Sequence, residues 1–214
     1  MKLLWRILAG AASDIVAESF LLIVFNFAWL VMSLLVLPLP FATGGLFHAA
    51  REIGDRKAVG WKTFFEGGRQ VAGPMYRWGA LNLLVGVVVI ANISFYGRLG
   101  QTYSDVLQSL FVTVASLWLL LQLYTLPVLI HLKQPGLRVA LQDGFFLMLR
   151  FTALSLAVTL IVLALISLSA VMPILLVLAT GALIAVLMNR VVAEELAWHQ
   201  TGRELARRHA SKEG

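Results

Sequence analysis

The chain has 214 residues, of which 60% are hydrophobic and 13% are charged, and its mean hydropathy is +0.87. Soluble domains average about 25% charged residues, so this composition excludes an ordinary soluble protein and predicts an integral membrane protein. The absence of cysteine excludes disulfides, thiolate metal sites and a cysteine nucleophile. The net charge is +6, but the basic residues flank hydrophobic segments, where anionic lipid headgroups attract them, so we expect no nucleic acid partner.

Residues 1–18 predict a short amphipathic helix in the membrane interface. Hydrophobic residues recur there at helical spacing, and Arg6 interrupts the hydrophobic run, which is atypical of a cleaved signal peptide. The hydrophobic face comprises Leu4, Ile7, Leu8, Ala11 and Ile15. We therefore expect this segment to remain uncleaved.

Residues 19–37 predict the first transmembrane helix, because they carry no charge and reach about 28 Å at about 1.5 Å per residue. Pro38 and Pro40 follow, and each removes a backbone donor, so the helix cannot run straight through them. The Thr-Gly-Gly sequence at 43–45 then predicts an irregular turn. This break is either a helix end at the interface or a re-entrant segment.

Four further spans are predicted at 78–97, 106–130, 151–170 and 174–189. The last two come from one uncharged run that is too long for a single crossing and that Pro173 divides. Residues 190–214 mix both charge signs and predict a solvated, cytoplasmic helical tail. The predicted fold is therefore all-α: residues 19–189 form a polytopic membrane helical bundle of about five transmembrane helices, with a proline-broken first span.

The predicted orientation follows from the Lys and Arg residues in the connections. With five spans, the N-terminal segment and the 98–105 connection share one side of the membrane, which carries three of these residues; the other fourteen fall on the opposite side. The positive-inside rule then predicts an outside N-terminus and a cytoplasmic C-terminus in a bacterial cytoplasmic membrane.

The connection after the first predicted span contains a basic amphipathic segment. Trp61, Phe64 and Phe65 stand at i, i+3 and i+4, with Lys62 and Arg69 beside them. This pattern is typical of a short helix on the membrane surface. It fits contact with lipid, and it also fits docking of a cytoplasmic or membrane partner.

No pattern typical of catalysis or metal binding is present in the sequence. The four histidines, His48, His131, His199 and His209, lack paired-ligand spacing, and no G-x-S-x-G motif occurs. No acid lies inside any predicted span, which disfavours both an enzyme and a proton-coupled transporter. We therefore expect no enzymatic activity, cofactor or metal.

Four amide side chains fall inside predicted spans: Asn26, Asn82, Asn92 and Gln122. Such groups commonly form hydrogen bonds between transmembrane helices, but they could instead line a path for a neutral solute such as a sugar. Small residues four apart, such as Gly181 and Ala185, allow close packing within one bundle or between two copies, so a homo-oligomer stays open.

Short motifs occur in a defined order along residues 26–127. They are Asn26 and Trp29 in N-x-x-W, Leu39, Pro40, Thr43 and Gly45 in L-P-x-x-T-x-G, the pair Ala49-Ala50, and Tyr124 and Pro127 in Y-x-x-P. This order resembles the YesL-like family of small bacterial integral membrane proteins, a domain of unknown function, although that family usually has Gly-Pro where this chain has Gly45-Leu46. The resemblance implies five spans and an accessory role in carbohydrate uptake or utilisation, beside an ATP-driven carbohydrate transporter or its regulator.

These observations together predict a non-enzymatic accessory protein that contacts the lipid bilayer and binds a partner. The binding segments would be the 51–73 connection and the broken end of the first span. The candidate partner-binding residues are Pro40, Thr43, Gly44, Gly45, Trp61, Phe64, Phe65 and Arg69. The alternative function is a small channel or carrier for a neutral solute, lined by Asn26, Asn82, Asn92 and Gln122.

Overall fold

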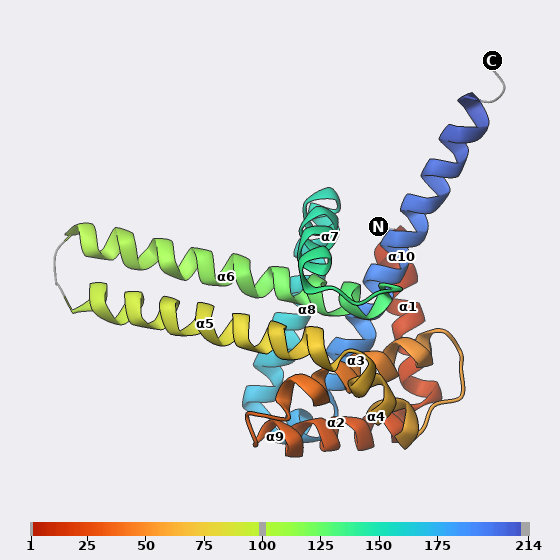
Figure 1. Cartoon of the computed structure of the whole chain (residues 1–214), viewed down its shortest axis with the longest axis horizontal. Coiled ribbons are helices and arrows are strands. Elements are labelled where there is room, and N and C mark those ends of the chain that lie inside the picture. The colour runs from red at the N-terminus through yellow and green to blue at the C-terminus, as the bar shows by residue number, and fades with distance from the viewer. Residues whose placement is uncertain (1, 99–101, 211–214) are drawn as a thin grey trace.

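The computed structural model of the protein describes residues 2–98 and 102–210, and within these ranges the regular structure is entirely helical (Figure 1). The helices are α1 (Lys2–Ala17), α2 (Ser19–Ser33), α3 (Leu39–Gly54), α4 (Trp61–Gln70), α5 (Ala72–Gly97), α6 (Thr102–His131), α7 (Leu137–Arg150), α8 (Thr152–Val171), α9 (Pro173–Leu175), the π-helical turn η1 (Leu176–Thr180) and α10 (Gly181–Ala210). The predicted all-α class is confirmed.

Within the described ranges, four helices are long and apolar enough to cross a membrane. They are Ala72–Gly97, Ser104–His131, Thr152–Val171 and Pro173–Trp198. The pair Leu3–Ala17 and Ser19–Ser33, which is bent by 88°, would bring the number to five if it formed one broken span. A helical bundle with four to five helices that could span a membrane fits the prediction, and the chain breaks at Pro173 as the sequence predicts.

The first predicted span ends earlier than expected, at Ser33, and the chain then turns back. Trp29 Nε1, near the end of α2, donates to Thr43 Oγ1, near the start of α3, at 3.1 Å. α2 and α3 therefore form an antiparallel helical hairpin. Pro40 lies in the first turn of α3, where a missing N–H costs little, so the prolines begin a helix rather than an irregular segment.

The two ends of the α2–α3 hairpin lie together. Arg56 follows α3, and Ser13 and Asp14 lie in the last turns of α1, shortly before α2 begins. Arg56 Nη2 donates to Ser13 Oγ at 3.0 Å and lies 3.7 Å from Asp14 Oδ1. Charge counting placed residues 1–18 and the 49–77 connection on opposite sides of the membrane. In the structure these two segments instead lie in contact, and a contact of this length is far shorter than a bilayer core of about 30 Å.

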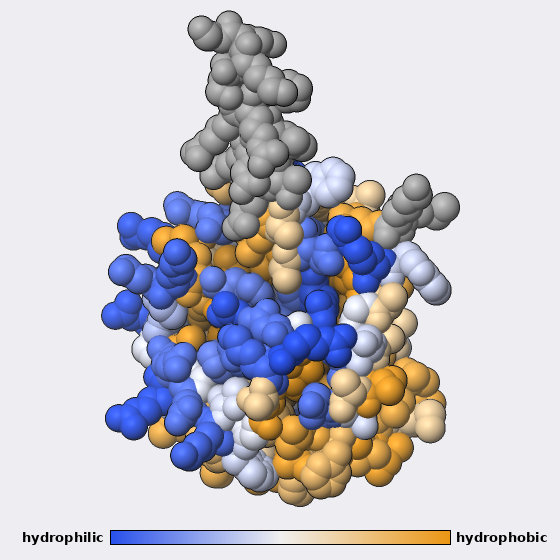
Figure 2. Space-filling model, turned by 90° about the vertical axis from the view of Figure 1, so that its right-hand side faces the viewer, coloured by the Kyte–Doolittle hydropathy of each residue, from blue (hydrophilic) through white to orange (hydrophobic). Residues whose placement is uncertain are grey.

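The other end of this hairpin, by contrast, is apolar. Its turn contains Leu34, Leu35, Val36 and Leu37, which are 66% to 77% exposed. In Figure 1 the turn points to the same side as the tip of the α5–α6 hairpin, away from the α3–α4 connection. Hydrophilic residues gather on the face seen in Figure 2, the side on which that connection lies.

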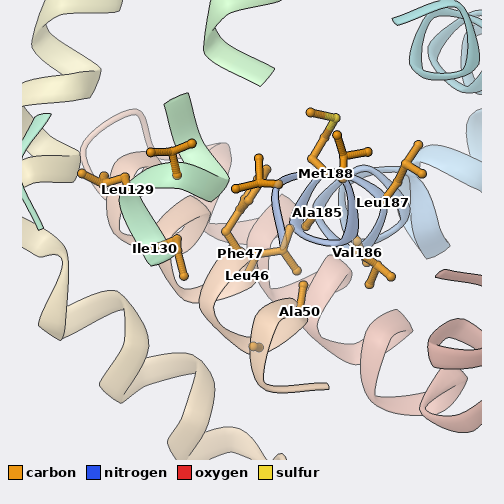
Figure 3. Packing of buried hydrophobic residues seen from close by; sticks show 14 of the residues in the cluster. Leu46, Phe47, Ala50, Leu129, Ile130, Ala185, Val186, Leu187 and Met188 are labelled. Carbon is orange, nitrogen blue, oxygen red and sulfur yellow. The ribbon is translucent and has the colours of Figure 1, made fainter. Parts of the chain in front are cut away.

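The core lies where α3, α6 and α10 meet. Leu46, Phe47 and Ala50 of α3 lie against the stretch 185–188 of α10, and Leu129 and the residue after it close one side (Figure 3). Burial of these large side chains stabilises the contact by about 25 cal/mol per Å² of apolar surface.

Helix α10 also changes the expected character of residues 190–214. The sequence predicts a solvated tail from Arg190 onward, but Val191, Val192 and Glu195 are fully buried. One reason is that α1 packs along α10, with Ile7 and Ala11 buried in the shared core. A second reason is that α6 covers another side of α10, where Tyr124 contacts Glu195. The hydrophobic face predicted for residues 1–18 therefore contacts protein. Side chains beyond Trp198 lie outside the described residues.

Candidate functional site

The two segments predicted to bind a partner lie against each other, because α4 packs on α3. Glycines set the separation of the helices. A Cβ added at Gly45 would lie 2.6 Å from the carbonyl oxygen of Phe64, and one at Gly68 would lie 2.9 Å from the carbonyl oxygen of Phe41. A Cβ added at Gly67 would clash with the His48 ring. Only hydrogen side chains permit backbones this close.

These glycine contacts correct one expectation. The sequence predicts an irregular turn at 43–45, but Thr43, Gly44 and Gly45 lie inside α3 and are buried. The threonine hydroxyl donates to the Leu39 carbonyl oxygen at 2.8 Å within the same helix. The glycines therefore serve close helix packing instead of a turn.

An aromatic cluster joins α4 to α2 and α3. The Phe25 and Phe64 rings are stacked, with centroids 5.6 Å apart, and the Trp61 and Phe65 rings are stacked at 6.1 Å. Phe41 lies 6.3 Å from Phe65. Phe64 is fully buried, whereas Trp61 and Phe65 are 52% and 46% exposed. Phe64 thus anchors the helix, and the other two rings are available to a binding partner.

We call the exposed surface formed by Trp61, Lys62, Phe65 and Arg69 the α4 face. Of the eight predicted partner-binding residues, three belong to it. The remaining five, Pro40, Thr43, Gly44, Gly45 and Phe64, are buried and position α4. A partner could therefore contact the first group directly, while the second group holds the surface in place.

The connection between α3 and α4 carries a network of exposed charges. Lys57 Nζ donates to Glu52 Oε1 at 2.9 Å and lies 3.6 Å from Asp55 Oδ2. The hydrogen bond that Lys57 donates to Glu52 raises the pKa of Lys57. Arg51 Nη1 donates to the Ile130 carbonyl oxygen at 2.6 Å, which joins this connection to α6.

Asn26, the first of the four amide side chains in the predicted spans, forms hydrogen bonds to the π-helical turn η1 and to the start of α10. Its Nδ2 donates to the carbonyl oxygens of Leu176 and Val177 at 2.9 and 2.8 Å, and its Oδ1 accepts from the Ala182 N–H at 3.0 Å. A π-helical turn disturbs the regular i to i+4 ladder, and in lipid each unpaired backbone group costs several kcal/mol. Asn26 satisfies these groups from a different helix.

The other three amides belong to the α5–α6 hairpin. Trp118 Nε1 donates to Asn82 Oδ1 at 2.9 Å, and Trp78 Nε1 donates to Gln122 Oε1 at 2.8 Å, so two bonds link the helices. Asn92 Nδ2 donates to the Val88 carbonyl oxygen of its own helix at 2.7 Å. Asn26 and these three side chains are thus not brought together, and they line neither cavity described below.

Two buried acids were missed by the sequence reasoning, which placed no acid in a span. Asp14 is fully buried and accepts from Arg190 Nε and Nη2 at 2.5 and 2.7 Å. Glu195 is also fully buried and lies on the apolar helix Pro173–Trp198. Its Oε1 accepts from the Tyr124 hydroxyl at 3.4 Å, and that hydroxyl lies 2.8 Å from Ser155 Oγ. The sequence contained one signal for the burial of Asp14, which lies on the same helical face as the hydrophobic residues of the segment 1–18.

Two cavities of the described part of the chain contain arginine side chains. One, of about 30 Å³, lies between α3, α6 and α10 and is lined by Arg51, His131 and Asn189 among others. The other is an open groove of about 500 Å³ between α5 and α7 that includes Arg77 and Arg138. Within the part of the chain that the structure describes, no three His, Cys, Asp or Glu side chains are grouped to hold a metal.

Comparison of the chain with protein-family models, with curated proteins and with solved structures gave no match.

Proposed function

We propose that this protein is a non-enzymatic membrane accessory protein whose α4 face docks a partner protein. The observation that carries the proposal is the exposure of Trp61 and Phe65 on a helix whose other side is fixed to α3 by glycine contacts. Aromatic residues beside arginine are enriched at the centres of binding surfaces. A fixed backbone beneath them reduces the entropy lost on binding.

The charges of the α4 face define the kind of partner. Lys62 and Arg69 are exposed, and neither has an ion-pair partner within residues 3–98 and 104–198. Glu66 is also exposed on α4, one turn from each of them, so a complementary surface would place acidic groups opposite Lys62 and Arg69 and an apolar pocket around the two rings. The resemblance to the YesL-like family is the ground for expecting an ATP-driven carbohydrate transporter or its regulator in that role.

We further infer that the chain crosses the bacterial cytoplasmic membrane four times, through α5, α6, α8 and the helix from Pro173 to Trp198. The contact between Arg56 and Ser13 supports a re-entrant α2–α3 hairpin that enters and leaves on one side. Both termini then lie in the cytoplasm. Of the 17 Lys and Arg residues, only Arg98 falls in a connection on the other side, so this topology obeys the positive-inside rule more fully than five spans do.

Single cysteines test this topology cleanly, because the chain has none of its own. Ala9→Cys, Ala58→Cys and Arg98→Cys place a thiol at exposed sites of α1, the α3–α4 connection and the α5–α6 tip. We expect a membrane-impermeant maleimide added to intact cells to label only the third. Labelling of Ala9→Cys together with Arg98→Cys would instead support five spans.

Photo-crosslinking tests the docking proposal in native membranes. A crosslinking residue at Lys62 should yield one protein adduct, which the double variant Trp61→Ala/Phe65→Ala removes. Trp198→Ala is the matched control, because Trp198 is 59% exposed on a different helix and should leave the adduct unchanged. Adducts with lipid alone at Lys62 would contradict the proposal and assign the α4 face to the membrane surface.

A further inference from the structure

An open groove of about 500 Å³ lies between the start of α5 and the first turns of α7. Its lining includes Arg77, Leu137, Arg138, Val139, Leu141 and Gln142. A volume of this size suits a small ligand or a lipid headgroup. None of these residues belongs to the α4 face, so this groove is a separate feature of the molecule.

The two arginines of this groove lack acidic partners. Neither Arg77 nor Arg138 forms an ion pair within residues 3–98 and 104–198, and no Asp or Glu lines the groove. Two guanidinium groups without counter-ions in one groove repel each other, and a bound anion would relieve that repulsion. Arginine in particular binds phosphate through paired hydrogen bonds.

The start of α7 adds further donors beside the arginines. This helix of 14 residues begins after Gly136, whose backbone is extended (φ −139°, ψ 119°), and no side chain caps its first turn. The free N–H groups of a first turn carry a partial positive charge and bind anions. The lining of this groove therefore includes the start of α7 and two exposed arginine side chains, all of which carry hydrogen-bond donors.

Apart from Gln142, the side chains that line the groove beside the arginines are apolar, which distinguishes this groove from a site for a soluble anion. Leu137, Val139 and Leu141 lie among the charged groups, and Val139 is 45% exposed. Arg77 stands directly before the apolar part of α5, at the depth where phospholipid headgroups meet acyl chains. A ligand that suits both parts carries a phosphate and a hydrocarbon chain.

We propose that this groove binds the headgroup of an anionic phospholipid, with its phosphate between Arg77 and Arg138 and its chain along the apolar side. Negative lipids are concentrated in the cytoplasmic leaflet, on which the inferred topology places both arginines. The binding would fix α7 against α5 without involving the α4 face, so this proposal can fail while the docking proposal stands.

The experiment measures lipid binding to the full-length protein by native mass spectrometry. Phosphatidylglycerol and phosphatidylcholine are titrated separately in detergent. We expect phosphatidylglycerol to bind at least tenfold more tightly than phosphatidylcholine. The double variant Arg77→Gln/Arg138→Gln should weaken phosphatidylglycerol binding at least tenfold. Arg98→Gln removes an exposed arginine at the other end of α5 and should bind phosphatidylglycerol as the unsubstituted protein does.

A second variant guards against a folding defect in the double variant. Gln142→Glu changes one exposed residue of the groove and adds a negative charge there. This variant should weaken the binding of phosphatidylglycerol and leave the binding of phosphatidylcholine unchanged. Equal affinity for the two lipids, or retained affinity in both groove variants, would overturn the proposal. Displacement of the lipid by millimolar inorganic phosphate would also overturn it, because the groove would then serve a soluble anion.

Discussion

Asp14 and Arg190 are separated by 176 positions in the chain, yet their side chains form a two-point ion pair with N–O distances of 2.5 and 2.7 Å. Asp14 is fully buried, and the Arg190 side chain is 23% exposed. The pair joins α1 to α10 at the polar end of the α2–α3 hairpin. It therefore connects the first helix of the chain to the last.

Removing one member of this pair should destabilise the protein strongly. Asp14→Asn leaves Arg190 without its carboxylate, and breaking a buried pair costs about 3–5 kcal/mol. Arg6→Gln is the control, because Arg6 is 59% exposed in its 2.7 Å contact with Glu194 and should cost less than about 1 kcal/mol. Thermal unfolding of the purified variants in detergent measures both effects. Equal melting temperatures for the two would contradict this assignment.

Asn26→Ala should lower the melting temperature more than Asn92→Ala. Asn26 bonds three backbone groups around the π-helical turn, and its loss leaves them unpaired inside an apolar region. Asn92 bonds only a carbonyl oxygen of its own helix. We expect a cost of about 2–3 kcal/mol for the first variant and about 0.5 kcal/mol for the second. Loss of solute flux in an Asn92 variant of normal stability would instead favour the carrier hypothesis.

Gly45→Ala should disrupt the attachment of α4 to α3. The added methyl group would meet a backbone oxygen, which cannot rotate away as a side chain does. Forced overpacking of this kind costs about 1–3 kcal/mol. Gly86→Ala, in the middle of α5, meets nothing within 4 Å and should be neutral or stabilising by up to about 1 kcal/mol. Limited proteolysis near α4 and thermal unfolding would report the difference.

Trp78→Phe should loosen the α5–α6 hairpin. The substitution keeps a ring but removes the donor to Gln122, whose Nε2 already lacks a hydrogen-bond partner among the described residues. We expect a loss of about 1 kcal/mol, typical of one hydrogen bond between membrane helices. Trp198→Phe is the control, because that residue is exposed on α10. Hydrogen exchange of the α5 and α6 amides would detect the loosening directly.

Hydrophobicity and proline predict much of this fold, because both act within one segment. The apolar runs locate α5, α6 and α8, and Pro173 marks the break before α10. Pro38 likewise follows the end of a helix. Local features could not reveal that the chain reverses there, since the reversal depends on the Trp29 to Thr43 hydrogen bond between helices.

Composition and local pattern predicted less well where the contacting residues are remote in sequence. Glu195 looked like part of a solvated tail, but its contact Tyr124 lies 71 positions away. Gly45 looked like a turn residue, since glycine serves both turns and close helix contacts. The α4 residues were identified correctly as an aromatic group, because their i, i+3, i+4 spacing is local. Their division into buried anchor and exposed face required the structure.

The hydrogen bonds of Asn26 to η1 bear on how the chain is made. The ribosome synthesises α2 long before residues 176–182. The Asn26 side chain therefore has none of its three hydrogen-bond partners until that later stretch has been made. Asp14 likewise lacks the partner of its two-point ion pair until Arg190 has been made. Until those residues are made, the polar side chains of Asn26 and Asp14 lack these partners, which they have in the folded protein. A chain truncated before residue 176 would leave the Asn26 amide and the Asp14 carboxylate without these partners.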